Sequence, residues 1–145
     1  GVSNGKQIKQ MMDLGACGIS MGSPFIATDE AEVSNAYKQA IVDYGAKDIV
    51  LTEKLSGSPC TVINTPYVQK VGTKRNFLET LLSKNKKLKK FIKMLTWYKG
   101  TKALEKSAFS TTYETVWCAG PSIEGVKSIR PVKQVVSDLI IDFEA

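Results

Sequence analysis

The sequence has 145 residues, of which 43% are hydrophobic and 23% are charged, and its formal net charge is +6. This composition is typical of a soluble globular protein, and no apolar run approaches the ~20 residues that a membrane-spanning helix needs. The absence of histidine excludes a Ser-His-Asp triad within the chain. The three cysteines are far apart and form no C-x-x-C pair, which argues against a transition-metal site. We expect Cys17, Cys60 and Cys118 to be buried, reduced thiols of a cytoplasmic protein.

The first 25 residues contain two glycine-marked turns, one at 1–5 and one at 21–24. Between them, apolar residues at helical spacing predict a helix that ends at Gly15, and residues 17–21 then predict a short buried strand. Each turn therefore falls where a strand would hand over to a helix. Two such turns, one βα unit apart, would place free backbone N–H groups and small hydroxyls side by side, which suits a phosphate.

Three interpretations of the first turn compete. The simplest is that its glycines only permit a tight turn. The second is a nucleophile elbow, because Gly1-Val2-Ser3-Asn4-Gly5 matches G-x-S-x-G literally, but that mechanism needs a histidine that the chain lacks. The third is a phosphate cradle, and the second turn at the right distance favours it.

The next elements carry clear start and stop signals. Ser34 or Asn35 is expected to cap a helix that runs to Asp43. Two short strands are predicted at 48–52 and 61–63, joined by a loop rich in serine, glycine and proline. Thr65-Pro66 then predicts a short helix that Gly72 ends.

The second half is mainly helical in pattern. A helix is predicted over 76–99, continuing over 100–109, and its lysines at 84–93 form a dense run of positive charge. This basic run is either a solvated face or a surface for nucleic acid or another acidic partner, and no base-reading motif accompanies it. A final amphipathic helix is predicted to start at Pro131.

The opening stretch resembles the C-terminal part of the nitronate monooxygenase family, FMN-dependent enzymes also called 2-nitropropane dioxygenases. The resemblance covers the first third of the chain well and the last thirty or so residues moderately. Beyond the two turns it is carried by Phe25-Ile26-Ala27-Thr28-Asp29-Glu30, Ala36-Tyr37-Lys38, Val50-Leu51-Thr52, Ser56-Gly57-Ser58-Pro59, Trp117-Cys118-Ala119-Gly120 and Ile129-Arg130-Pro131.

The resemblance implies an FMN-binding site that the two turns share. Gly1 matches the phosphate-turn glycine of the family, and the segment Ser20, Met21, Gly22 and Ser23 matches the one that meets the phosphate and neighbouring flavin atoms. With Ser3, these are the expected cofactor-binding residues, and no catalytic acid or base is assigned. Relatives often have glutamine for Ser20, threonine-arginine for Ser23-Pro24 and glutamine for Pro121. Contacts from an arginine at position 24 or a glutamine at position 121 are therefore in doubt.

The resemblance also implies the fold: an α/β chain that forms the C-terminal portion of a (β/α)₈ TIM barrel. Such a barrel needs roughly 250 residues, so we expect a longer enzyme whose earlier part supplies the other strands. Residues 1–46 would hold the last βα units and the FMN phosphate site, and 47–145 a mainly helical extension packed on the barrel.

The implied function is that of a flavin oxidoreductase that oxidises alkyl nitronates with O2. An FMN-dependent enoyl-acyl-carrier-protein reductase, an NADH:quinone reductase and a non-enzymatic basic module stay open as alternatives. The expected partners are a small-molecule substrate and the earlier part of the same enzyme, without a membrane or nucleic acid. A homo-oligomer is left open.

Overall fold

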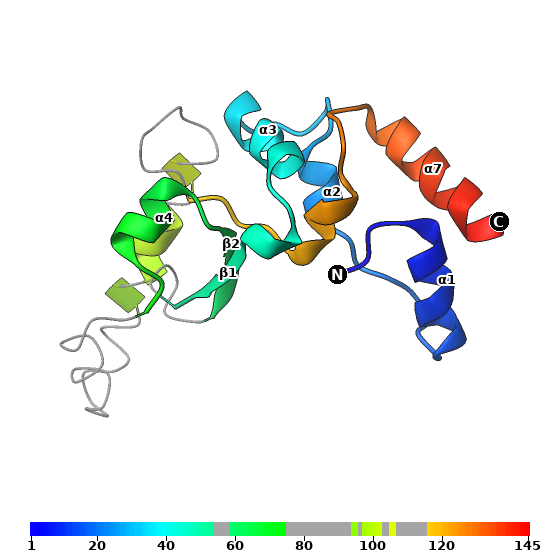
Figure 1. Cartoon of the computed structure of the whole chain (residues 1–145), viewed down its shortest axis with the longest axis horizontal. Coiled ribbons are helices and arrows are strands. Elements are labelled where there is room, and N and C mark those ends of the chain that lie inside the picture. Colours follow the sequence, from blue (N-terminus) through cyan, green and yellow to red (C-terminus); the bar gives the residue numbers. More distant parts are fainter. Residues whose placement is uncertain (54–58, 75–93, 96, 103–104, 107–115) are drawn as a thin grey trace. The chain divides into compact units, whose positions relative to one another are not determined.

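The computed structural model describes residues 1–53, 59–74, 94–95, 97–102, 105–106 and 116–145. They group into two compact units, one made of 1–47 with 119–145 and the other of 48–118 (Figure 1). Residues 119–145, which we expected in the helical extension, thus belong to the same unit as the opening turns. No helix among these described residues is both long and apolar enough to cross a bilayer.

The first unit begins with α1 (Gly5–Asp13), which confirms the predicted helix. The side chain of Asn4 caps it by accepting the N–H of Gln7 at 2.9 Å. At the other end Gly15 adopts φ 96°, and the N–H groups of Gly15 and Ala16 donate to the carbonyls of Met12 and Met11 at 2.9 and 3.0 Å. This is the Schellman arrangement, which requires a left-handed residue directly after the helix, so glycine is needed at position 15.

The strand predicted at 17–21 is wrong, because these residues form a loop that joins α1 to α2 (Ser23–Ile26). Cys17 and Ser20 are exposed, so the expected burial of the Cys17 thiol is wrong as well. A strand is held by hydrogen bonds to a neighbouring strand, and no described residue pairs with this segment. The local sequence pattern predicted a strand, but a strand is stable only when a neighbouring strand is hydrogen bonded to it.

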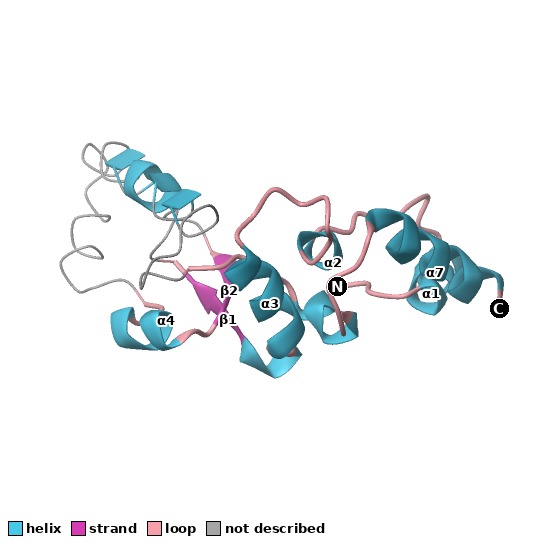
Figure 2. Ribbon diagram, turned by 90° about the horizontal axis from the view of Figure 1, so that it is seen from above, coloured by secondary structure: helices cyan, strands magenta, loops and turns pink. Residues whose placement is uncertain are grey.

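Two further helices complete the first unit. α3 (Asn35–Asp43) is capped by Ser34, as predicted, and buries Tyr37, Ala40 and Ile41. The C-terminal helix α7 (Val132–Glu144) packs against α1, and both views show these two helices side by side (Figures 1 and 2). The carboxylate of Glu30 accepts the N–H of Val132 at 2.9 Å and so caps α7 from a distant loop. A short 3₁₀ helix, η2 (Pro121–Gly125), precedes α7 in the chain and packs against α2.

The second unit contains the two predicted strands as an antiparallel pair. β1 (Ile49–Thr52) and β2 (Cys60–Ile63) pair in register from Ile49 opposite Ile63 to Thr52 opposite Cys60, after the short 3₁₀ helix η1 (Ala46–Asp48). α4 (Pro66–Val71) follows with Thr65 as cap and Gly72 at φ 78°, as predicted. Residues 94–95, 97–102 and 105–106 are helical, whereas the remainder of the predicted helix over 76–109, including its basic face, lies outside the described residues.

A pair of thiols lies at the edge of this small sheet. Val62 bridges to Cys118, and the Cys118 thiol is hydrogen bonded to that of Cys60. Burial, together with the smaller effect of the neighbouring Cys60 thiol, raises the pKa of Cys118 to about 11. The Cys118 thiol therefore stays protonated in the folded chain well above neutral pH.

This raised pKa predicts a loss of stability at high pH. Between pH 9 and 11 the unfolded chain releases the Cys118 proton while the folded chain keeps it, so the free energy of unfolding falls as the pH rises. Solvent screening of the half-buried thiol limits the loss to about 1 kcal/mol. We expect the free energy of unfolding, measured with urea, to fall between pH 8 and pH 10.5 by about 1 kcal/mol more in the natural chain than in Cys118→Ala. An equal fall in the free energy of unfolding in both proteins would contradict the prediction.

Candidate functional site

The two opening turns meet a third segment from the far end of the chain. A Cβ added to Gly1 would lie 3.0 Å from Cβ and 3.1 Å from Oγ of Ser122. The hydroxyl oxygen of Ser23 accepts the N–H of Gly120 at 2.9 Å. A Cβ added to Gly120 would in turn lie 3.6 Å from the Ser23 hydroxyl and 3.8 Å from the Ser122 hydroxyl. These four residues, which we call the serine–glycine cluster, bring both turns onto one short segment.

The backbone around Gly22 offers unused hydrogen-bond donors. The amides at positions 20–23 have no acceptor among the described residues, and Gly22 starts α2 without a side-chain cap. Gly22 is exposed, and a Cβ added to it would meet no atom within 4 Å. The side chain of Ser20 is exposed and that of Met21 is half-buried. An anion placed in this open space would therefore find several N–H groups at short range.

The hydroxyl of Ser23 can take part in the same site. Its oxygen already accepts the Gly120 N–H, and no described residue accepts its hydrogen. A serine hydroxyl is one donor as well as an acceptor, so this hydrogen is available to a ligand oxygen. Gly120 thereby fixes the position of the hydroxyl, while Pro24, buried in the first turn of α2, fixes the start of the helix.

Ser3 is used differently from the other predicted residues. Its amide and its hydroxyl both donate to Oε1 of Gln7, at 2.8 and 3.2 Å. Its side chain also packs on Gly125, where an added Cβ would lie 2.7 Å from both Cβ and Oγ of Ser3. Ser3 thus ties the start of α1 to η2, and a direct contact of its hydroxyl with a phosphate stays a prediction.

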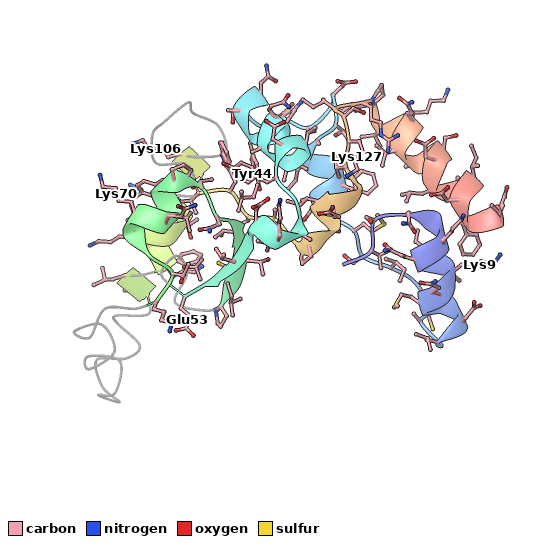
Figure 3. All side chains as sticks on the ribbon, viewed as in Figure 1. Lys9, Tyr44, Glu53, Lys70, Lys106 and Lys127 are labelled. Carbon is pink, nitrogen blue, oxygen red and sulfur yellow. The ribbon has the colours of Figure 1, made fainter. Side chains whose placement is uncertain are left out.

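Charged groups lie around the cluster rather than in it. The carboxylate of Glu124 accepts the N–H of Ala46 at 2.8 Å, and the ammonium of Lys127 donates to the Glu124 carbonyl at 2.7 Å. Figure 3 shows Lys127 beyond η2 and Lys9 on α1. A separate pocket of about 270 Å3, which Ser3, Pro24 and the ion pair of Arg130 with Asp138 help to line, lies between this part of the unit and α7. The side chains of the cluster are uncharged, so an anion there would be held by amides and hydroxyls.

The comparison with known families shows to which family the chain belongs. The profile of the nitronate monooxygenase family matches residues 1–142. The chain belongs to the nitronate monooxygenase family. The family consists of oxidoreductases, and the resemblance inferred from the two turns is confirmed.

Curated relatives extend well beyond the matched region. A probable nitronate monooxygenase of Staphylococcus saprophyticus is 34% identical over 71 residues, which is 49% of this chain and 20% of the relative. A (3aS,4S,5R,7aS)-5-hydroxy-7a-methyl-1-oxo-octahydro-1H-indene-4-carboxyl-CoA dehydrogenase of Rhodococcus jostii is 27% identical over 124 residues, which is 82% of this chain and 35% of the relative. The matched region therefore spans a fifth to about a third of the length of these two family members.

Solved structures show the same fold. FabK from Thermotoga maritima aligns with a TM-score of 0.74 at 24% identity, covering 99% of this chain and 42% of that one. Nitroalkane oxidase from Streptomyces ansochromogenes aligns with a TM-score of 0.64 at 19% identity, covering 99% of this chain and 37% of that one. These alignments support the predicted α/β class, whereas the assignment to the last βα units of a barrel stays a prediction.

Sequence reasoning missed Ser122 as a member of the site. Residues 117–120 carry part of the family resemblance, but nothing local indicates that Ser122 reaches Gly1. The available signal was the small-residue run at 119–122, which resembles in composition the two opening turns. Small residues in three separate turns are consistent with close backbone approach to one ligand.

Proposed function

We propose that this chain supplies the FMN phosphate site of an oxidoreductase that oxidises alkyl nitronates with O2. The observation that carries the proposal is the convergence of both opening turns on Gly120–Ser122, with the donors at 20–23 left unused beside them. The predicted residues Gly1, Ser20, Met21, Gly22 and Ser23 all lie in or next to this region. Family membership gives the cofactor class, and the unused donors fit it.

FMN ends in a phosphate dianion, which sets what its site must provide. Backbone amides at a helix start carry partial positive charge and point their hydrogens at an anion, which is the arrangement before α2. The Ser23 hydroxyl adds a directed donor, and the missing Cβ of Gly22 leaves room for phosphate oxygens. When bound, FMN supplies the electron-transfer chemistry, and this chain's residues bind and orient its phosphate end.

The remaining chemistry must come from other residues of the enzyme. With no histidine in the sequence and no acid or base in the serine–glycine cluster, we assign no proton transfer to this chain. We propose that the 145 residues form the last βα units of a (β/α)₈ barrel and its extension. The rest of the same enzyme then supplies the other strands, the small-molecule substrate pocket and the general base.

Two other flavin-enzyme functions remain as alternatives, an enoyl reductase and an NADH:quinone reductase. The alignments with FabK and with the enoyl reductase domain of MlnA from Bacillus amyloliquefaciens, the latter at a TM-score of 0.70 and 15% identity, favour an enoyl reductase as the second candidate. The two functions differ in their electron donor and acceptor. Oxygen uptake with an alkyl nitronate would support nitronate oxidation. Oxidation of NAD(P)H with an enoyl thioester or with a quinone would instead support the corresponding reductase.

The cofactor assignment is tested by removing one hydroxyl. In the full-length protein, Ser23→Ala is expected to raise the dissociation constant of FMN about 10- to 100-fold, because a hydrogen bond to a charged group is worth about 1.5–3 kcal/mol. Flavin fluorescence quenching measures this, and thermal melting of the flavin-free protein checks that the loss of the Gly120 contact does not unfold it. Thr61→Ala, which removes an exposed hydroxyl from β2, is the matched control. Unchanged FMN affinity in Ser23→Ala would contradict the site.

A further inference from the structure

Ser122 has two hydrogen-bond donors that the described part of the chain leaves unused. It is half-buried in η2, two residues after Gly120, and its side chain lies against Gly1. Neither its backbone N–H nor its hydroxyl hydrogen meets an acceptor among the described residues. A half-buried donor is satisfied by protein, by water or by a ligand. Ser122 is therefore able to donate to a ligand oxygen.

The hydroxyl groups of Ser23 and Ser122 flank one open point above Gly120. A Cβ added to Gly120 would lie 3.6 Å from the Ser23 oxygen and 3.8 Å from the Ser122 oxygen, and no other described atom outside the adjoining residues lies within 4 Å of it. The two oxygens are therefore separated by at most about 7.4 Å, the sum of these two distances. We call this point the Gly120 notch. Two hydroxyl groups form its walls, and a residue without a side chain forms its floor.

The Gly120 notch is narrow enough for one phosphate group to reach both serines. A hydroxyl donates to an ionised oxygen at about 2.5–2.7 Å, so two such hydrogen bonds, one from each wall, span roughly 5 Å. The separation of two oxygens on one phosphorus covers the rest of the distance. The Ser23 oxygen already accepts the Gly120 N–H at 2.9 Å, which leaves its hydrogen free to turn toward the notch. A single phosphate above Gly120 can therefore accept from both serines.

Proline occupies the position next to each of these serines. Pro24 follows Ser23 and Pro121 precedes Ser122, at the two positions where relatives often have arginine and glutamine. Proline has no N–H and no polar side chain, so neither position donates a hydrogen bond in this chain. The side-chain donors at the notch are therefore the two hydroxyl groups, and neither carries a charge.

We propose that Ser122 is a second side-chain ligand of the FMN phosphate, which lies in the Gly120 notch and accepts hydrogen bonds from Ser23 and Ser122 together. This inference rests on the proposed function, because it takes FMN as the ligand. It adds a third turn to the site, and with it the residue that holds the phosphate from the far end of the chain. Riboflavin, which has the same ring system but no phosphate, gains nothing from either serine.

Loss of one hydroxyl group tests the role of Ser122. In the full-length protein, Ser122→Ala should raise the dissociation constant of FMN about 10-fold, as for one hydrogen bond to a charged group, and leave that of riboflavin unchanged. A purely structural role would weaken the binding of both flavins alike. Ser128→Ala, which removes an exposed hydroxyl without a described partner, is the matched control and should change FMN affinity by less than ~2-fold. Fluorescence quenching titrations measure both flavins.

Filling the notch tests the position of the phosphate. Gly120 has φ −101°, which alanine adopts without strain, and the new methyl group would lie at ordinary contact distance from both hydroxyl groups. Gly120→Ala should therefore leave the melting temperature of the flavin-free protein unchanged. It should raise the dissociation constant of FMN at least ~10-fold, because the methyl group occupies the place of the phosphate.

The outcomes separate this inference from the proposed function. Reduced FMN affinity in Ser23→Ala, with natural affinity in both Ser122→Ala and Gly120→Ala, would overturn the inference and leave the phosphate beside residues 20–23. This result is expected if another part of the enzyme occupies the notch. Equal losses for FMN and riboflavin in Ser122→Ala would overturn the inference as well. Natural FMN affinity in all three variants would overturn the proposed function together with it.

Discussion

Gly5→Ala is expected to destabilise the chain by at least about 3 kcal/mol. Gly5 is buried at the start of α1, and a Cβ added there would lie 2.2 Å from the carbonyl oxygen of Leu139 and 2.3 Å from the amide nitrogen of Phe143. Those two atoms are four residues apart in α7, so they are the acceptor and donor positions of one helical hydrogen bond. The methyl group cannot be accommodated by a change of rotamer, because its neighbours are backbone atoms, and α1 must separate from α7.

Urea unfolding followed by circular dichroism measures this effect, with Gly18→Ala as its matched control. A Cβ added to Gly18 meets no atom within 4 Å, and its φ is not positive, so that change should alter the free energy of unfolding by less than ~0.5 kcal/mol. Alanine is normally the better helix former by about 1 kcal/mol, so any destabilisation at position 5 comes from packing. Equal stability of the two variants would show that α1 does not pack on α7 at Gly5.

Gly22→Asp is expected to reduce FMN affinity of the full-length protein by at least ~100-fold. The new carboxylate would enter the open space beside the amides at 20–23, where it would repel a phosphate dianion. Two charges 4 Å apart near a protein surface interact by about 4 kcal/mol, which exceeds the ~2.7 kcal/mol of a hundredfold change. Aspartate is also a favourable residue at a helix start, so α2 itself should not be lost.

Gly18→Asp serves as the control for that variant. It adds the same charge to the same loop, also in open space, but outside the segment expected to bind phosphate. Equilibrium dialysis with FMN should give near-natural affinity for Gly18→Asp and strongly reduced affinity for Gly22→Asp. Equal losses in the two variants would indicate a general charge effect, and no loss in either would remove the phosphate from this segment.

Local chemistry explains which elements the sequence could predict. Ser34, Thr65 and Gly15 lie at the ends of α3, α4 and α1, where each satisfies backbone groups within a few residues. Such signals are complete in the sequence because the donor, acceptor and chain direction are all local. The strands of the antiparallel pair were also within reach, since only a short loop separates them.

Long-range contacts explain what the sequence could not predict. A strand was predicted at 17–21, but only a neighbouring strand can hold one there, and none lies among the described residues. Gly5 belongs to a turn for which we predicted phosphate binding, yet in the structure it packs directly against the backbone of α7. Likewise, Ser122 joins Gly1 across almost the whole chain, and no periodicity within a window can show that pairing.

The exposed thiol at Cys17 makes this chain easy to study. It lies between α1 and the amides at 20–23, while Cys60 and Cys118 are half-buried and the latter stays protonated at neutral pH. A maleimide fluorophore should therefore attach at position 17 before the other two positions, without any engineered residue. Its emission would then report on molecules that arrive a few residues away, and flavin in particular would quench it by energy transfer.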